Sequence, residues 1–123
     1  MRRTAEFANG WCPLGSNRTF PMATAEQLKA GLERLAQYAQ RFGRDPSEIE
    51  TIYRTPRLEL SKDPAGSGRP AFVGDADQIA GDIRNYQDAG ATSIVVDFIR
   101  QTDDLNVMLG RMEEFATQVW PKV

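Results

Sequence analysis

Residues 93–99, SIVVDFI, form an apolar run rich in β-branched side chains, in which polar residues do not alternate regularly with apolar ones. A strand that faces solvent on one side shows such alternation, whereas a strand covered on both faces of a parallel sheet is apolar almost throughout. The run therefore predicts a buried strand of a parallel sheet. It restricts the chain to folds in which helices cover the faces of the sheet.

Helical patterns lie between the segments that read as extended. A capping box begins at Thr24, where two side chains satisfy each other's free backbone amides, and it predicts a helix over residues 25–42. Asp75 begins a second box and predicts a helix over residues 76–89. Apolar side chains at helical spacing predict a third helix over residues 103–119.

The extended segments complete an alternating order of strands and helices. Residues 10–12 and 50–60 read as strands, with a break expected at Pro56 because proline cannot donate to a strand ladder. Residues 61–70 read as a loop, and residues 71–73 as a short extended piece. Two α/β architectures fit this order: part of a (β/α) barrel, and a ferredoxin-like βαββαβ sandwich with a trailing helix. The direction of strand pairing separates them, because the sandwich has an antiparallel sheet.

The composition excludes several kinds of chemistry. The 123 residues include no histidine, so catalytic triads and ordinary zinc catalysis are not expected. Cys12 is the single cysteine, which rules out an internal disulfide, and we expect no metal site. The formal charge of −2, with both signs interspersed, argues against nucleic-acid binding. We find no signal peptide or membrane span in the sequence, so we expect a cytoplasmic protein.

Several phrases, in order along the whole chain, resemble the C-terminal region of luciferase-like monooxygenases, which are flavin- and deazaflavin-dependent barrel oxidoreductases. They are RTAEFANGW at 3–11, LERL at 32–35 with GRDP at 43–46, VGDADQI at 73–79, and YQDAGAT at 86–92. The resemblance implies that residues 1–123 form one incomplete domain, the C-terminal half of a (β/α)₈ TIM barrel. Residues 2–7 fit this interpretation, because they read as the end of a helix too short to form alone.

The resemblance also implies a function and partners. It implies a flavin- or deazaflavin-dependent oxidoreductase or monooxygenase, with FMN or the deazaflavin coenzyme as cofactor and a small-molecule substrate. Most cofactor contacts in that family would lie upstream of Met1, so we expect that the chain alone is inactive and does not bind a flavin cofactor tightly. We expect self-association or a complementing upstream half, because open strand edges invite pairing. The alternative is a non-catalytic half-barrel remnant or self-associating α/β module.

Candidate site residues follow from the carboxyl ends of the strands, where (β/α) barrels carry their function. Asp97, Phe98 and Arg100 are candidates for the substrate rim, with a simple rim salt bridge as the alternative. Trp11 and Gly74 are candidates for cofactor binding. The alternative for Trp11 is a tryptophan that only fills the core. The alternative for Gly74 is a helix start that the Asp75 carboxylate caps, so that it would repel a phosphate. No catalytic residue is identified. The rim loops are expected at residues 12–23, 61–70 and 97–102.

Overall fold

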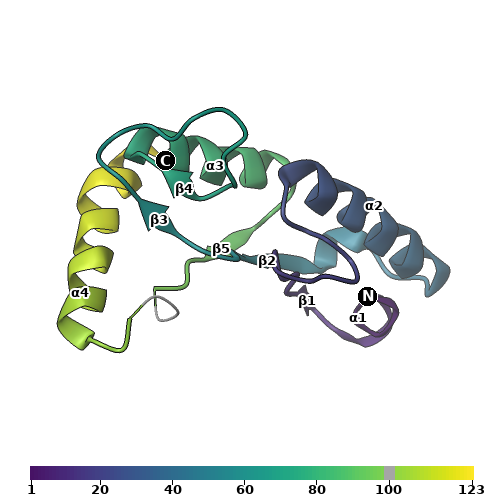
Figure 1. The fold of residues 1–123 in the computed structure, drawn as a ribbon. Coiled ribbons are helices and arrows are strands. Elements are labelled where there is room, and N and C mark those ends of the chain that lie inside the picture. Colours follow the sequence, from purple (N-terminus) through teal and green to yellow (C-terminus); the bar gives the residue numbers. More distant parts are fainter. Residues whose placement is uncertain (99–101) are drawn as a thin grey trace.

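The computed structural model describes residues 1–98 and 102–123. The described chain alternates short strands with helices (Figure 1). The helices are α1 (Arg2–Phe7), α2 (Ala25–Arg41), α3 (Ala76–Asp88) and α4 (Leu105–Glu114), with a 3-10 turn at Pro46–Glu48. The strands are β1 (Gly10–Trp11), β2 (Glu50–Arg54), β3 (Glu59–Leu60), β4 (Val73–Gly74) and β5 (Ser93–Val95).

Every described strand pair is parallel. β1, β2 and β5 form a three-stranded sheet in that order, and β3 pairs with β4 in a separate two-stranded sheet. Within the main sheet, β1, β2 and β5 lie side by side in their order along the chain, while β3 and β4, which come between β2 and β5 in sequence, pair only with each other. The ferredoxin-like alternative was therefore wrong, and the predicted parallel arc of strands is confirmed.

Both capping boxes form as predicted. In α2 the Gln27 backbone N–H donates to Thr24, and the Gln27 side chain accepts from the Thr24 backbone. Asp75 and Gln78 make the same reciprocal pair at the start of α3. Gly43, just past α2, has a φ of 70°, which suits a residue without a β-carbon.

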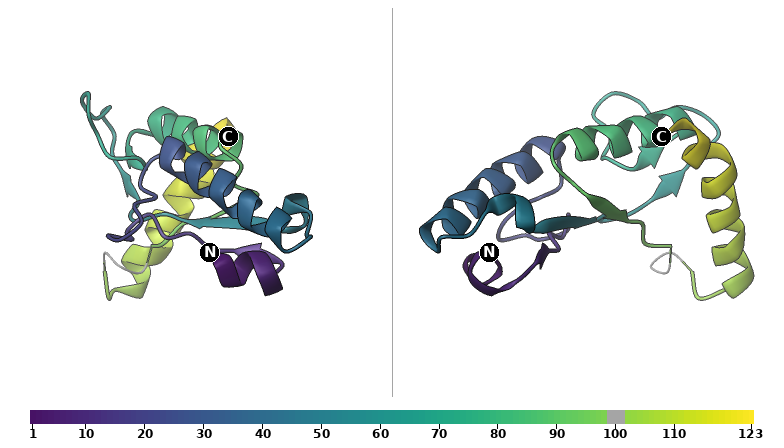
Figure 2. Two further views of the ribbon diagram at one scale, coloured as in Figure 1. Left: turned by 90° about the vertical axis from the view of Figure 1, so that its right-hand side faces the viewer. Right: turned by 180° about the vertical axis from the view of Figure 1, so that it is seen from behind.

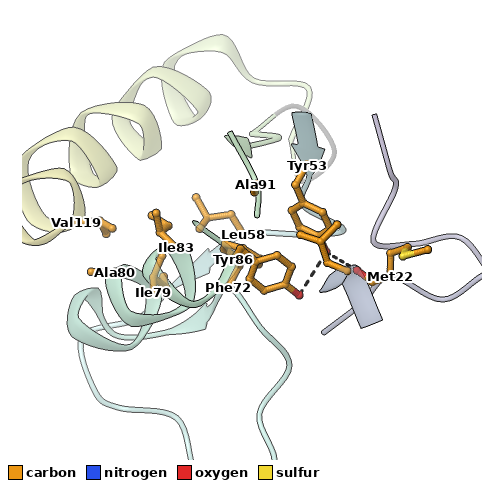
Figure 3. Packing of buried hydrophobic residues seen from close by; sticks show 11 residues of the cluster. Met22, Tyr53, Leu58, Phe72, Ile79, Ala80, Ile83, Tyr86, Ala91 and Val119 are labelled. Atoms are coloured by element: carbon orange, nitrogen blue, oxygen red, sulfur yellow. Dashed lines mark hydrogen bonds between the residues drawn. The ribbon is translucent and has the colours of Figure 1, made fainter. Parts of the chain in front are cut away.

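The core lies between the sheet and the helices α2 and α3, which run along one side of it (Figures 1 and 2). Tyr86 packs its ring against both Tyr53, at a centroid distance of 4.4 Å, and Phe72, at 5.0 Å (Figure 3). Leu28 from α2 and Ile83 from α3 belong to the same cluster. This packing holds the two helices and strand β2 together.

The last helix departs from the sequence prediction. The prediction was a regular helix to residue 119, but the α-helix ends at Glu114 and continues as a π-helical turn, Phe115–Val119. Val119 is fully buried, and this turn contacts α3. The wider turn is the part of this segment that packs into the core, whereas α4 itself has no buried residue.

Candidate functional site

The carboxyl ends of β1 and β2 meet at one edge of the sheet. The Arg54 backbone N–H donates to the Pro13 carbonyl, and the Gly15 N–H donates to the Arg54 carbonyl, both at 3.2 Å. Leu14 forms an isolated parallel bridge with Arg54. The loop after β1 therefore lies against the end of β2, where the sequence placed a functional rim.

Arg54 and Asp97 meet at this edge across two neighbouring strands. Arg54 pairs with Val95 in the register of β2 and β5, so Asp97 lies just beyond the pairing. An Arg54 Nη2 donates to Asp97 Oδ2 at 2.6 Å. The Asp97 side chain is 6% exposed and that of Arg54 42%. The buried carboxylate of Asp97 is therefore paired with the positive charge of Arg54, whose side chain remains partly exposed to solvent.

The sequence analysis selected Asp97 as a rim candidate and did not select Arg54. The signal for Arg54 was its position as the last residue of a strand, but the strand register is needed to bring it to Asp97. Arg100, the other charged candidate, lies outside the described residues.

Phe98 faces the helices. Its ring meets that of Phe115 edge-on, with 5.8 Å between centroids. It also lines a small cavity of about 230 Å³ with side chains from β3 and α4. These contacts anchor the C-terminal helix, and a direct role of Phe98 toward substrate stays a prediction.

A larger cleft of about 720 Å³ opens at the same carboxyl edge, a volume within the range of small-molecule sites. One wall is the start of α2 at Thr24–Glu26, and the other is the glycine-rich loop at 65–71. Pro56 and Arg57, just past β2, also line it, as does Tyr86. Both the loop after β1 and the loop after β3 therefore reach one cleft, as the rim prediction requires.

The glycine-rich wall is anchored to α3 at both ends. At one end the Gln78 side chain exchanges two hydrogen bonds with the backbone of Ala65, at 2.8 and 2.9 Å. At the other end the Arg69 guanidinium binds both carboxylate oxygens of Asp82, at 2.6 and 2.9 Å. Between these anchors, residues 66–68 form the wall of the cleft.

The Arg69–Asp82 pair is mostly buried, with side-chain exposures of 21% and 10%. The hydrogen bonds that Arg69 donates to Asp82 raise the pKa of Arg69 above its ordinary value. Sequence reasoning missed this pair. The two residues are thirteen positions apart in a loop and a helix, and no local pattern links them.

The opposite wall is held by two tyrosines of the core. The Tyr53 hydroxyl donates to the Met22 carbonyl at 2.8 Å (Figure 3). The Tyr86 hydroxyl donates to the Ala23 carbonyl at 2.7 Å. Burial raises the pKa of both phenols, most strongly that of Tyr86. The neutral hydroxyls thus fix the residues that lead into α2 and set the width of the cleft.

The two residues predicted to bind a cofactor, Trp11 and Gly74, both lie against side chains of neighbouring helices. Trp11 is half-buried and faces α2, where a β-carbon on Gly31 would touch its ring. At Gly74, which has a φ of 146°, a β-carbon would collide with the side-chain amide of Gln78. The Gln78 amide oxygen and the Asp75 carboxylate accept hydrogen bonds from the backbone N–H groups of Asp75 and Gln78 at this helix start, and cofactor binding at Gly74 stays a prediction.

Neither a metal-binding cluster nor a disulfide is found among the described residues. Within 1–98 and 102–123, no cluster of carboxylate and cysteine side chains suits a metal ion. Cys12 is exposed and has a free thiol. In the same described part of the chain, none of the helices combines the length and apolar character needed to cross a bilayer. The arrangement can bind and orient a polar molecule at the rim, and redox chemistry there would need a cofactor.

The described fold is an open α/β sheet with parallel neighbouring strands, as in part of a (β/α) barrel. Among solved structures, the coenzyme F420-dependent tetrahydromethanopterin reductase from Methanopyrus kandleri is similar, with a TM-score of 0.65 and 16% sequence identity. The match covers 98% of this chain and 47% of that one, so this chain spans about half the length of the structure it matches. At this identity the likeness establishes the fold alone. No protein family model and no curated protein sequence matches the chain.

Proposed function

We propose that this chain is part of a luciferase-like oxidoreductase that uses a deazaflavin or flavin cofactor, and that it supplies the substrate side of the active-site rim. The observation that carries the proposal is the structural match over 98% of the chain to about half of a coenzyme F420-dependent reductase. The phrases that resemble the luciferase-like family in the same order support it independently. The cofactor named for the matched reductase favours a deazaflavin over FMN.

The described residues fit a substrate role better than a cofactor role. The cleft at the carboxyl edge has the size of a small-molecule site and polar groups on both walls. Gly74, by contrast, lies beneath the side chain that caps α3. A bound cofactor would carry the hydride or electrons, while Arg54, Asp97 and the cleft walls orient a polar substrate. Contacts of a cofactor with Trp11 or Gly74 stay a prediction.

A domain with half the strands of a barrel cannot enclose a planar ring system, because tight sites bury most of the ligand surface. The proposal therefore includes a second half-barrel segment that completes the site, and it treats residues 1–123 as one incomplete domain. The competing proposal is a non-catalytic α/β module. It is favoured by the apolar side chains that α4 leaves exposed.

A fluorescence titration with coenzyme F420 and with FMN tests the proposal. The chain alone is compared with the chain mixed with the polypeptide encoded immediately upstream. We expect no saturable binding by the chain alone, and saturable binding of one cofactor by the mixture. In the mixture, Asp97→Asn should leave cofactor binding unchanged and impair substrate-dependent reduction of the cofactor, followed by visible absorbance. A mixture that binds neither cofactor contradicts the proposal and favours the non-catalytic module.

A further inference from the structure

A second cavity, separate from the cleft, lies between α1, the loop that follows β1, and α2 (Figure 1). Its volume is about 390 Å³, which is within the range of small-molecule sites. Its apolar lining comes mainly from Trp11, Leu14, Phe20 and Tyr38. We call this cavity the Trp11 pocket. Leu14 and Phe20 are 42% and 56% exposed, so they offer apolar surface that a bound molecule would cover.

The loop that forms one wall of the Trp11 pocket is fixed by hydrogen bonds within the chain. In its middle, Asn17 Oδ1 accepts hydrogen bonds from the backbone N–H groups of Thr19 and Phe20, both at 3.0 Å. Near its end, the Met22 carbonyl accepts the 2.8 Å hydrogen bond from the buried Tyr53 hydroxyl. A ligand therefore enters a pocket that is already formed, and such a pocket loses little conformational entropy on binding.

The charges around the Trp11 pocket favour an anion. Arg2 from α1 and Arg34 from α2 line it, and none of the described lining residues is acidic. In the described part of the chain, neither arginine forms an ion pair. The wider surroundings have the same sign. Residues 1–44 hold seven basic and three acidic side chains, whereas residues 45–123 hold eight basic and fourteen acidic ones. The positive potential of the chain is thus concentrated in the segment that builds this pocket.

The combination of side chains in the pocket suits an aromatic molecule with an acidic group. Aromatic rings pack favourably against the rings of Trp11, Phe20 and Tyr38 in stacked or edge-to-face arrangements. A guanidinium binds a carboxylate or sulfonate through parallel N–H groups, and it also stacks on aromatic faces. Arg2 already lies over an aromatic face, with 5.7 Å between its guanidinium carbon and the centroid of the Phe42 ring. The pocket therefore provides for both parts of such a ligand.

We propose that the Trp11 pocket binds a small aromatic anion, whose ring lies among the aromatic side chains and whose acidic group pairs with Arg2 and Arg34. The site is distinct from the cleft, because no residue lines both cavities, and its volume of about 390 Å³ against 720 Å³ suits a smaller molecule. The two cavities nevertheless share a wall, since Gly15 and Ala23 of the same loop line the cleft. An occupant of the Trp11 pocket therefore also steadies one wall of the cleft.

The test uses the fluorescent probe anilinonaphthalene sulfonate and its neutral counterpart phenylnaphthylamine, which has the same rings without the sulfonate. Fluorescence titrations measure the dissociation constant of each probe for the unchanged chain, Arg2→Gln, Arg34→Gln and the control Lys29→Gln. Lys29 is an exposed residue of α2 that does not line the pocket, so the control removes the same charge elsewhere on that helix. Circular dichroism checks that each variant is folded.

We expect saturable binding of one sulfonate probe per chain. Arg2→Gln and Arg34→Gln should each weaken it by about three- to tenfold, because each removes a charged hydrogen-bond donor to the sulfonate. Lys29→Gln should change it by less than about twofold, because an exposed charge outside the pocket is screened by salt. The neutral probe should bind all four forms equally, since it has no group for either arginine to pair with.

The thiol of Cys12 shows where the probe binds. Cys12 lines the pocket and is the only cysteine in the sequence, so its alkylation by N-ethylmaleimide measures access to this pocket. The bound sulfonate probe should slow this alkylation in proportion to the fraction of chains that it occupies. Hydrogen exchange of residues 12–22 should slow as well, because the loop wall packs against the probe.

Four results would overturn the inference. The first is the absence of saturable binding. The second is equal weakening by Lys29→Gln and the two arginine variants, which would indicate diffuse attraction to a positive surface. The third is binding that leaves the alkylation rate of Cys12 unchanged, which would place the probe elsewhere on the chain. The fourth is displacement of the probe by FMN or coenzyme F420 at lower concentrations than the probe itself needs, which would make the pocket part of a cofactor site. The proposed function does not depend on this pocket, so the first three results leave it unaffected.

Discussion

The carboxylate of Asp82 accepts a hydrogen bond from the backbone N–H of Phe72 at 2.7 Å, and Phe72 has a φ of 63°. A bulky residue rarely adopts this left-handed conformation, which costs about 1–3 kcal/mol unless its surroundings enforce it. Here the same carboxylate binds Arg69, and the Phe72 ring is buried against Tyr86. One helical side chain thus holds both the strained residue and the glycine-rich wall of the cleft.

Replacing Asp82 should therefore destabilise more than the loss of one ion pair. We expect Asp82→Ala to lower the free energy of unfolding by about 2–4 kcal/mol, because the mostly buried guanidinium of Arg69 loses its charged partner and the buried N–H of Phe72 loses its acceptor. Asp88→Ala, at an exposed position near the end of the same helix, is the control and should change it by less than about 0.5 kcal/mol. Urea unfolding measures both values, and similar values for the two variants would contradict this role of Asp82.

Two glycines near and within α3 should respond in opposite directions to alanine. Gly74→Ala should destabilise the chain by about 2 kcal/mol or more, since its φ of 146° suits only glycine and the new β-carbon meets Gln78. Gly81→Ala should stabilise it by about 0.5–1 kcal/mol, because Gly81 lies inside α3 with open space around it. Thermal unfolding of the pair checks the signs. A stabilising Gly74→Ala would mean that the loop before α3 can rearrange freely.

Stability should fall at alkaline pH. The folded-state pKa values of Tyr53 and Tyr86 are raised above the ordinary value of 10.0, chiefly by burial. Their contribution is fully present below about pH 10, and it is lost as the pH rises above that, since only the unfolded chain then ionises. Unfolding curves at about pH 8 and about pH 11 should show the loss. The double variant Tyr53→Phe with Tyr86→Phe should show a smaller difference between the two pH values, whereas Tyr38→Phe, on the outer part of α2, should keep the full difference.

Arg54, the last residue of β2, and Arg57, just beyond it, should contribute differently to stability. Arg54→Gln should destabilise by about 1–2 kcal/mol, because the carboxylate of Asp97 is almost fully buried and loses a charged donor. Arg57→Gln should change stability by less than about 0.5 kcal/mol, because its contact with Glu59 is 3.5 Å long and exposed on both sides. Urea unfolding at low and at high salt separates them. An equal effect of both substitutions would show that the rim pair is as solvated as an ordinary surface contact.

Helix starts and the strand break could be predicted because their causes are local. Thr24 and Asp75 cap helices through residues three positions away, and Pro56 interrupts the extended segment by its own missing N–H. β5 ends at Val95, four residues before the end of the apolar run. The chain leaves the sheet there, and Asp97 then binds Arg54, a contact that depends on the neighbouring strand.

The same distinction between local and distant causes applies to the candidate site. The loops that line the rim were predicted from strand direction alone, which needs only the order of elements. Two ion pairs were not predicted: Arg69 with Asp82, and Arg54 with Asp97. Each pair joins two separate elements, and no local sequence pattern shows how those elements are placed relative to each other. The π-helical turn Phe115–Val119 was missed for a related reason, since its packing against α3 is a tertiary contact.

The parallel order of the main sheet also affects how the chain folds. Gly10 pairs with Glu50, and Ile52 pairs with Ser93, so each strand contact joins residues about 40 positions apart. The main sheet contains no hairpin that could form early from local contacts. The entropy cost of closing loops of this length must be met before the strand contacts that offset it can form. During synthesis β1 cannot pair until β2 has been made, and β2 cannot pair with β5 until β5 has been made. The apolar residues of these strands stay exposed to solvent in the meantime. We therefore expect slow refolding, with α2 and α3 forming ahead of the sheet that they cover.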